Sequence, residues 1–172
     1  MKITNEEKQK LEELYQHYLH HYLILQMKDV PMHFGSNCYN HSFRVAKVCI
    51  HRAIRSRKNY DLEALLVGAI LHDYYLYDWR EDRDMKKKHG RRHPLVAAEN
   101  AKRDFNISEK VQNIIKSHMW PLTPRLFPKT REAKMLNYVD DVIATREFMT
   151  STKHKKKNAQ KYAKMIEHLF DK

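Results

Sequence analysis

The chain is 172 residues long, and its 33 Lys and Arg residues against 21 Asp and Glu give a formal net charge of +12. This length fits one ordinary domain with a sizeable core, and 42% hydrophobic with 31% charged residues is typical of a globular protein. Only 3 glycines and 5 prolines favour long helices over many tight turns. The composition predicts a single all-α domain over residues 1–172 and argues against a disordered chain or a second domain.

The positive charge predicts a surface that attracts anions such as nucleotides, phosphoesters or nucleic acid. The lysines concentrate at residues 86–88 and 153–157, and no arginines interleave with aromatic residues as on a base-stacking platform. A small anionic ligand therefore explains the charge as well as a nucleic acid does.

The cysteines and the apolar runs indicate the compartment. Cys38 and Cys49 fall eleven residues apart on one predicted helix, about 16 Å along its axis, so they cannot form a disulfide within that helix. No apolar run approaches the length of about 20 residues needed to span a bilayer, and residues 1–10 lack the apolar segment of a signal peptide. We expect reduced thiols, a cytoplasmic location and no membrane contact.

The first half of the chain predicts three helices. The first, over about 5–27, follows a capping residue at Thr4, and residues 31–36 break the pattern before a second helix over about 37–57. A third helix begins at Asp61 as its N-cap and ends in His72-Asp73. Because this third helix is apolar on nearly every side, we expect it to be the central and most buried one.

The second half predicts a loop and four helices. Residues 74 to about 92 are aromatic and then densely charged, which indicates a loop or lid. Pro94 is placed to begin a fourth helix, with His93 at its N-cap edge. The remaining helices are expected from Ser108 to His118, from about Thr130, and over about 156–170. A bundle of about seven helices results, with the first and last helices packed on a core over about 34–148.

Histidine and aspartate residues at the helix ends suggest metal binding. His72 and Asp73 end an apolar helix, where they are costly to bury unless something pairs with them or ligates them. A cap or a local ion pair is the alternative for this dipeptide. His17 and His21 are one turn apart on the first helix, but a surface position explains them better because no third ligand lies nearby in sequence.

Further candidate ligands lie at helix boundaries or beside apolar stripes on several other predicted helices, the usual way in which helical bundles build metal sites. The complete series in chain order is His41, His72, Asp73, His93, His118 and Asp140. Imidazole and carboxylate suit zinc, iron and manganese alike, so the series does not select among these metals.

This series, with the flanks His41-Ser-Phe-Arg44-Val-Ala and Ala69-Ile-Leu-His72-Asp73, resembles the HD-domain superfamily of metal-dependent phosphohydrolases over about residues 34–148. The resemblance implies a first metal bound by His41, His72, Asp73 and Asp140. It further implies that Asp73 bridges to a second ion held by His93 and His118, as in two-metal branches of the superfamily. Asp140 is preferred to its neighbour Asp141, which stays open as an alternative because both acids interrupt an apolar stripe.

The implied chemistry is hydrolysis of a nucleotide or another small phosphoester by metal-activated hydroxide, with one or two Fe, Mn or Zn ions. Cationic side chains near the site would hold the other phosphate oxygens, first Arg44 and then Arg80, Arg91, Arg92 or Arg125. Asp78 is a candidate general acid or base, and an exposed loop acid without a role is the alternative.

The segment after Asp73 departs from named branches. The cyclic-dinucleotide phosphodiesterases usually carry lysine, and single-metal nucleotidases often carry glutamate, at the position that Leu76 occupies here. The aromatic residues of the 74–80 segment suggest stacking on a nucleobase, or packing of a lid over the core. Two other functions stay open, namely a di-iron oxygenase with the same six ligands and a nucleotide or nucleic-acid binder without catalysis.

Overall fold

The structure is a computed structural model that describes residues 3–32, 36–81 and 83–153. Within those ranges it is built of helices without strands, which confirms the all-α prediction. The elements are α1 (Asn5–His20), α2 (Tyr22–Leu25), the 3-10 turn η1 (Gln26–Lys28), α3 (Cys38–Arg55), α4 (Leu62–Leu71), α5 (Arg83–Phe105), α6 (Glu109–Lys116) and α7 (Arg131–Lys153). The expected last helix over about 156–170, and the basic run beyond Lys153, lie outside the described residues.

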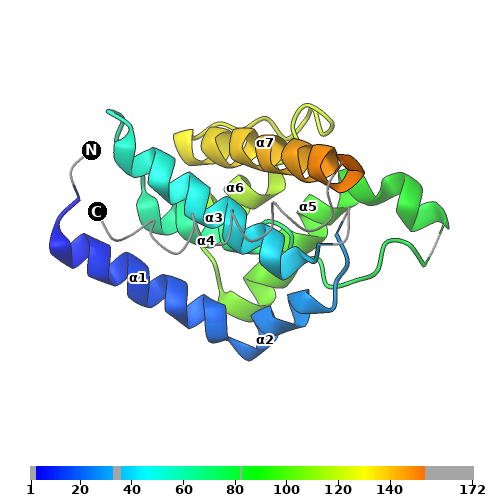
Figure 1. Ribbon diagram of the computed structural model, residues 1–172, viewed down its shortest axis with the longest axis horizontal. Coiled ribbons are helices and arrows are strands. Elements are labelled where there is room, and N and C mark those ends of the chain that lie inside the picture. The colour runs from blue at the N-terminus through cyan, green and yellow to red at the C-terminus, as the bar shows by residue number, and fades with distance from the viewer. Residues whose placement is uncertain (1–2, 33–35, 82, 154–172) are drawn as a thin grey trace.

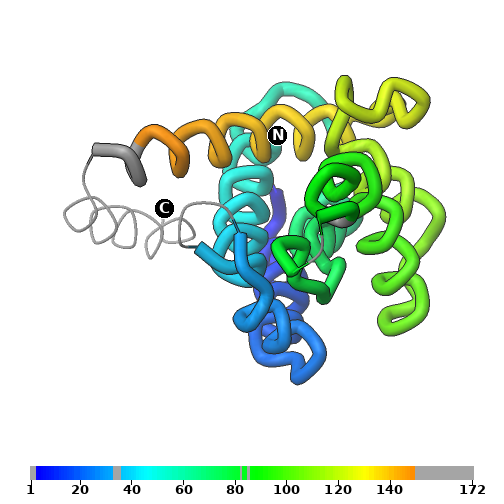
Figure 2. The backbone as a smooth tube through the Cα atoms, turned by 90° about the vertical axis from the view of Figure 1, so that its right-hand side faces the viewer, coloured from blue at the N-terminus to red at the C-terminus, as the bar shows by residue number. Residues whose placement is uncertain are grey.

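Helix α4 is the centre of the core, as its uniformly apolar sequence predicts. It contacts α1, α3, α5, α6 and α7, and eight of its ten residues are buried. Figure 1 shows α3 and α4 between α1 on one side and α7 on the other, and Figure 2 shows α7 crossing the end of this layer. The C-terminal end of α4, where His72 and Asp73 follow, is therefore enclosed by neighbouring helices.

Polar side chains fix the helix starts much as the sequence indicates. The Thr4 hydroxyl accepts a hydrogen bond from the Glu7 amide while the Glu7 carboxylate accepts one from the Thr4 amide, a complete capping box. Asp61 and Ser108 cap α4 and α6 by accepting the amides of Ala64 and Val111. Since these caps satisfy otherwise unpaired amides, the starts of the helices follow from local sequence.

The expected first helix over 5–27 is not continuous. His21 adopts an extended backbone, with φ −69° and ψ 128°, and its Nδ1 accepts the Leu23 amide, so that α1 ends and α2 begins at this residue. The apolar spacing continued through the break, which is why the sequence alone suggested one helix. The imidazole of His21 supplies a cap that apolar periodicity does not reveal.

The prediction of a loop through residue 92, with His93 at a helix start, is wrong. Helix α5 begins at Arg83, ten residues before His93, and it holds Pro94 in its interior. His89 and His93 lie one turn apart with both side chains buried, and the His93 ring donates a hydrogen bond to the His89 carbonyl. Tertiary burial of these histidines explains why helix extends through a segment where proline suggested a start.

A close approach of α6 to α4 brings the ends of these two helices together. A Cβ atom at Gly68 of α4 would lie 2.7 Å from the Ile114 side chain of α6, too close for any larger residue without rearrangement. Helix α6 ends at Lys116, two residues before the expected end, and His118 follows in the turn after it. Glycine at position 68 thus lets the His118 ring approach the end of α4.

Two expectations about the chemical environment concern the thiols and membrane spans. Cys38 and Cys49 are both buried in α3 as free cysteines, as the eleven-residue spacing predicts. Among the helices of the described residues, none combines the length and the apolar character needed to cross a membrane.

Candidate metal centre

The structure brings the six predicted ligands into one buried cluster. They come from the start of α3, the residues just after α4, the middle of α5, the turn after α6 and the middle of α7. The most exposed of the six, Asp140, is only 7% exposed. Three overlapping groups, each with its candidate ligand atoms within 4.8 Å of one another, are His41/His72/Asp73, His72/His118/Asp140 and Asp73/His93/His118.

Backbone carbonyls hold three of the four imidazoles in one tautomer. The Nδ1–H groups of His72, His93 and His118 donate to the carbonyls of Ala69, His89 and Ile115 at 2.8, 3.0 and 2.8 Å. Two of these carbonyls, those of Ala69 and Ile115, belong to the last turns of α4 and α6, and the Ile115 carbonyl also accepts the His118 backbone amide. When neutral, each of these three rings therefore directs the lone pair of its Nε2 atom into the cluster.

The half of the cluster between α3 and α7 pairs imidazole with carboxylate. The Nε2 atom of His41 lies 2.8 Å from Asp140 Oδ1. The Nε2 atom of His72 is 3.3 Å from Asp73 Oδ2 and 3.5 Å from Asp140 Oδ1, yet it is fully buried without a hydrogen-bond partner of acceptable geometry. A buried, unpartnered nitrogen facing two carboxylates is suited to a cation placed between them.

The half between α5 and the turn after α6 sets two imidazoles against each other. The Nε2 atoms of His93 and His118 are 2.9 Å apart, although each ring already donates through Nδ1 to a carbonyl. In their neutral forms the two lone pairs face one another, an arrangement that repels unless a proton or a metal ion intervenes. This pair is consequently the clearest indication of a cation-binding position in the cluster.

Asp73 lies between the two halves and faces each with a different oxygen. Its Oδ2 atom lies 3.3 Å from His72 and 4.0 Å from His41, whereas its Oδ1 atom lies 3.3 Å from His93 and 3.8 Å from His118. A carboxylate with one oxygen toward each imidazole pair has the arrangement needed to bridge two ions.

The pKa values of His41, in the first half, and His118, in the second, are shifted in opposite directions. Burial acts to lower the pKa of His41, but hydrogen bonds to Asp140 and Glu147 outweigh it and raise this pKa to about 9. Burial, together with the neighbouring His93 and His72, lowers the pKa of His118 to about 3. Although burial opposes ionisation of Asp73 and Asp140, the adjacent histidines hold both carboxyl pKa values below the usual range.

The donor set fits a divalent metal ion. Neutral imidazole nitrogens and ionised carboxylates bind zinc, iron and manganese, and the orphaned His72 nitrogen and facing His93 and His118 nitrogens are what such an ion would satisfy. The first half offers His41, His72, Asp73 and Asp140 as ligands. The second offers Asp73, His93 and His118, which leaves more of an ion's coordination sphere open to other ligands.

A buried cluster of imidazoles and carboxylates gathered from five helical segments places the chain among all-α proteins with a site able to hold divalent metal. The model of the HD domain matches residues 38–145, and the chain belongs to this family. Most HD domains are metal-dependent hydrolases. Comparison with curated proteins and with solved structures yields no match.

The cationic residues predicted to hold a substrate occupy different surroundings. Arg44 lies one turn after His41 on α3, with its side chain 36% exposed, and it forms an ion pair with Glu147. Arg80, which is exposed, pairs instead with the partly buried Asp78 in the segment after α4, at 2.7 Å. Arg91 and Arg92 are exposed on α5, and Arg125 is exposed between α6 and α7. Arg44 is thus connected with the cluster through Glu147, which faces His41.

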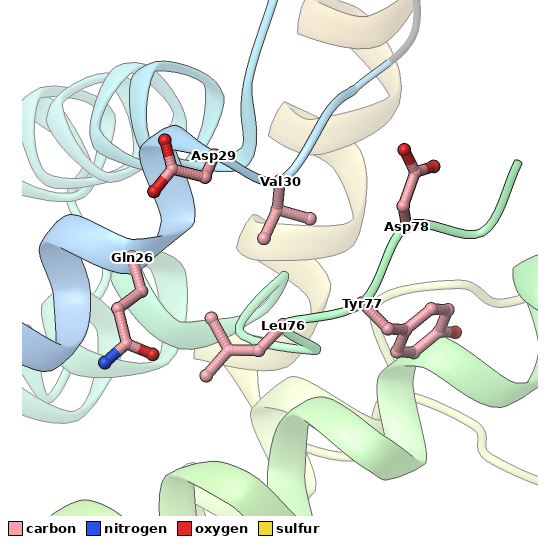
Figure 3. Close-up of a pocket in the computed structure, with 6 residues that line it drawn as sticks. All are labelled: Gln26, Asp29, Val30, Leu76, Tyr77 and Asp78. Atoms are coloured by element: carbon pink, nitrogen blue, oxygen red, sulfur yellow. The ribbon is translucent and has the colours of Figure 1, made fainter. Parts of the chain in front are cut away.

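Asp78 lies apart from the metal cluster. It lines an open pocket of about 330 Å³ between η1 and the segment after α4, together with Gln26, Asp29, Val30, Leu76 and Tyr77. Figure 3 shows the pocket with the Asp78 carboxylate directed away from Leu76 and Gln26. None of the six predicted ligands lines this pocket, and the hydrogen bonds recorded for Asp78 join it to Arg80.

The aromatic residues after Asp73 pack on the protein. Tyr74 and Tyr75 are buried, and their hydroxyls donate to Asp104 and to the sulfur of Met32. Trp79 stacks on His89, with ring centroids 5.3 Å apart, and donates to the Pro31 carbonyl. Of the two interpretations for this segment, packing over the core is therefore the one that these contacts support.

Three residues near the site were not identified by the sequence analysis. Glu147 faces the Nδ1 atom of His41 at 3.2 Å, and its position seven residues after Asp140, two helical turns, was the available signal. His89 stacks on His93 with centroids 4.7 Å apart, a pairing hidden while residue 89 was assigned to a loop. Asn137 donates to the carbonyls of His118 and Trp120 and so fixes the turn after α6, for which the sequence offers no signal.

The alternative histidine pair on α1 is not arranged for chelation. The rings of His17 and His21 are 5.4 Å apart, but the Nδ1 atom of His21 accepts the Leu23 amide and forms the cap of α2. His21 also packs on Phe105 and Tyr22. These contacts give His21 a structural role in place of the expected surface position, whereas His17 is exposed as expected.

Proposed function

We propose that the chain is a metal-dependent phosphohydrolase that cleaves a nucleotide or another small phosphoester. The observation that carries the proposal is the position of Asp73, whose two oxygens face separate imidazole pairs, His41/His72 on one side and His93/His118 on the other. When bound there, divalent ions would supply the Lewis acidity that activates water and neutralises charge on a phosphoryl group.

The chain's own residues prepare this site. The surrounding histidines keep the pKa values of Asp73 and Asp140 low, so both carboxylates are ionised and can balance the charge of a divalent ion. The Nδ1–H donations to Ala69, His89 and Ile115 orient three imidazoles before any ion arrives. Burial of the cluster excludes bulk water, which strengthens every charge interaction within it.

An anionic substrate is supported by charge and by Arg44. The net charge of +12 attracts anions, and the half-exposed Arg44 lies one turn beyond His41. A guanidinium has five N–H donors, so a single ion pair with Glu147 uses only part of what Arg44 offers. Arg44 is thus proposed to bind non-reacting phosphate oxygens, whereas Asp78 and Arg80, paired with each other, are assigned a structural role in their segment.

The test is metal reconstitution followed by a hydrolysis screen. The protein is stripped with a chelator, reloaded separately with Mn²⁺, Zn²⁺ or Fe²⁺, and assayed on nucleoside mono-, di- and triphosphates and on phosphodiesters. We expect phosphate release that requires metal and disappears in Asp73→Asn. The matched control is Asp141→Asn, which removes an exposed carboxylate and is expected to retain activity.

The same experiment separates the other functions. Turnover that needs Fe and consumes oxygen, with no phosphate released under anaerobic conditions, would contradict hydrolysis and assign the site to an oxygenase. Binding of RNA with a steep salt dependence, unaffected by His72→Ala and without any metal in the purified protein, would contradict a metalloenzyme altogether.

A further inference from the structure

Glu147 contacts His41, which differs from the other three predicted histidine ligands in the partner of its Nδ1 atom. Within the described residues, His72, His93 and His118 donate Nδ1–H to the main chain, but the Nδ1 atom of His41 lies 3.2 Å from Glu147 Oε2. His41 is fully buried, and the side chain of Glu147 is only 14% exposed. A buried carboxylate thus takes the place that carbonyl oxygens have at the other three rings.

The register of α7 places the His41 ring between two carboxylates. Asp140 and Glu147 are seven residues apart, so they lie two turns apart on the same face of α7, the face packed against α3. Asp140 faces Nε2 of His41 at 2.8 Å and Glu147 faces Nδ1. Both ring nitrogens are therefore engaged from the same helix.

This arrangement matters because two tautomers of neutral His41 compete. In one, Nε2–H donates to Asp140, which blocks the lone pair needed for a metal and occupies a carboxylate oxygen as well. In the other, Nδ1–H donates to Glu147, and the Nε2 lone pair is directed at the cluster. A carboxylate acceptor at Nδ1 favours the second tautomer and also makes Nε2 a stronger electron donor.

We propose that Glu147 is a positioning residue of the metal centre, which holds His41 in the tautomer that can bind the first ion. Arg44 supports it through the ion pair with Glu147, so that the carboxylate is charge-balanced although mostly buried. The contacts run in order from the half-exposed Arg44 through Glu147 and His41 to Asp140. This inference rests on the proposed metal-dependent function and extends it to a residue outside the ligand set.

The test measures Zn²⁺ affinity of the chelator-stripped protein by competition with a chromogenic chelator. Glu147→Ala removes the acceptor and is expected to weaken binding of the ion that His41 would hold by about 10–100-fold, the usual cost of losing such a partner. Glu147→Gln keeps an oxygen that can accept Nδ1–H, so it should recover most of that loss. Glu99→Ala, which removes an exposed glutamate from α5, is the matched control and should bind as wild type does.

A double-mutant cycle with His41→Ala tests whether Glu147 acts through His41. Once His41 is absent, Glu147→Ala should cause no further loss of Zn²⁺ affinity, because the two residues act as a unit. Nitrogen-15 chemical shifts of neutral His41 in the metal-free protein should show a larger share of the Nδ1–H form in wild type and in Glu147→Gln than in Glu147→Ala. They should show increased Nε2–H form in Glu147→Ala.

The outcomes separate this inference from the function on which it rests. If wild type binds no Zn²⁺, the proposed metal-dependent function fails. The positioning role is wrong, and the metal site stands, if wild type binds Zn²⁺ in a His41-dependent manner but Glu147→Ala binds it equally well. The same conclusion follows if Glu147→Ala lowers Zn²⁺ affinity by the same factor in the His41→Ala background as in wild type. Circular dichroism of each metal-free variant excludes loss of the helical fold as the cause.

Discussion

The two halves of the cluster differ in the groups that surround their buried imidazoles. Between α3 and α7, the His41 imidazole lies between the carboxylates of Asp140 and Glu147, so a proton can balance charge when no ion is bound. Between α5 and the turn after α6, His93 and His118 direct Nε2 atoms at each other over 2.9 Å, with Asp73 as the shared carboxylate.

This difference indicates what each half gains from a metal ion. The carboxylate-rich half is satisfied in part by protons, so metal binding there must displace a proton and should strengthen as pH rises. The imidazole-rich half has fewer carboxylates to stabilise a protonated imidazole. A cation between His93 and His118 would remove the repulsion between their facing Nε2 lone pairs. Four protein ligands against three also suggest a tighter ion in the first half and a more exchangeable one, open to substrate, in the second.

The largest expected effect comes from the residue shared by both halves. Asp73→Asn keeps the size of the side chain but removes the charge that both halves use, so binding should weaken at both positions. We expect hydrolysis to fall by more than about 100-fold, because loss of a ligand shared by both ions should cost more than the roughly 10–100-fold that loss of an outer hydrogen-bond partner costs. Metal content by mass spectrometry and phosphate release check this, and a variant that keeps two ions with normal turnover would remove Asp73 from its bridging role.

Substitution of the two adjacent aspartates of α7 tests the first half alone. Asp140 is buried against His41, whereas Asp141 is exposed, so only Asp140→Asn should affect the cluster. We expect Asp140→Asn to weaken the tighter ion by about 10–100-fold or more and Asp141→Asn by less than about twofold. Calorimetric titration of metal into the stripped protein measures both, and the reverse order would make Asp141 the ligand.

The pH dependence of stability should differ in sign between the halves of the metal-free protein. The pKa of His41 is raised to about 9, so its stabilising contribution is complete below pH 6.5 and is lost as pH rises through 9. The pKa of His118 is lowered to about 3, so folding favours its neutral form and stability is lost as pH falls from 6.5 through 3.

Urea unfolding of the chelator-stripped protein across this pH range measures both effects. His41→Gln should flatten the alkaline side and His118→Gln the acid side, each by up to about 1.4 kcal/mol per pH unit. If both variants change the same side, the two halves do not differ in charge balance as described.

The smallest effect is expected at Asp78, outside the cluster. Because the side chain of Asp78 pairs with Arg80 and none of the six predicted ligands lines its pocket, Asp78→Asn should change kcat and KM by less than about twofold. Steady-state kinetics on the best substrate checks this. A loss of kcat above tenfold, with an altered pH profile, would restore Asp78 as a general acid or base.

Local sequence fixed the starts of several helices and pointed to the six candidate ligands. Asp61 and Ser108 cap helices where capping rules predict, and the order and flanks of His41, His72-Asp73 and Asp140 led to the family whose model matches residues 38–145. Such features depend on neighbours along the chain, so they can be inferred without a fold. The metal-binding role of these residues remains a proposal.

Where local signals conflicted with burial, the prediction failed. Pro94 normally marks a helix start, but α5 runs through it from Arg83 because His89 and His93 are buried against the rest of the molecule. The break at His21 has a different cause, a local side-chain cap that apolar spacing does not reveal.

By itself, the sequence determined the helical class, the buried α4 and the candidate ligands, because periodicity, caps and residue chemistry are properties of the chain. Only the tertiary structure decided that Asp73 faces both imidazole pairs, that His93 opposes His118, and that Glu147 rather than a carbonyl contacts Nδ1 of His41. Apart from the contact between the neighbours His72 and Asp73, these contacts join residues 20 to 106 positions apart. Helix packing sets such distances, and sequence separation carries no information about them.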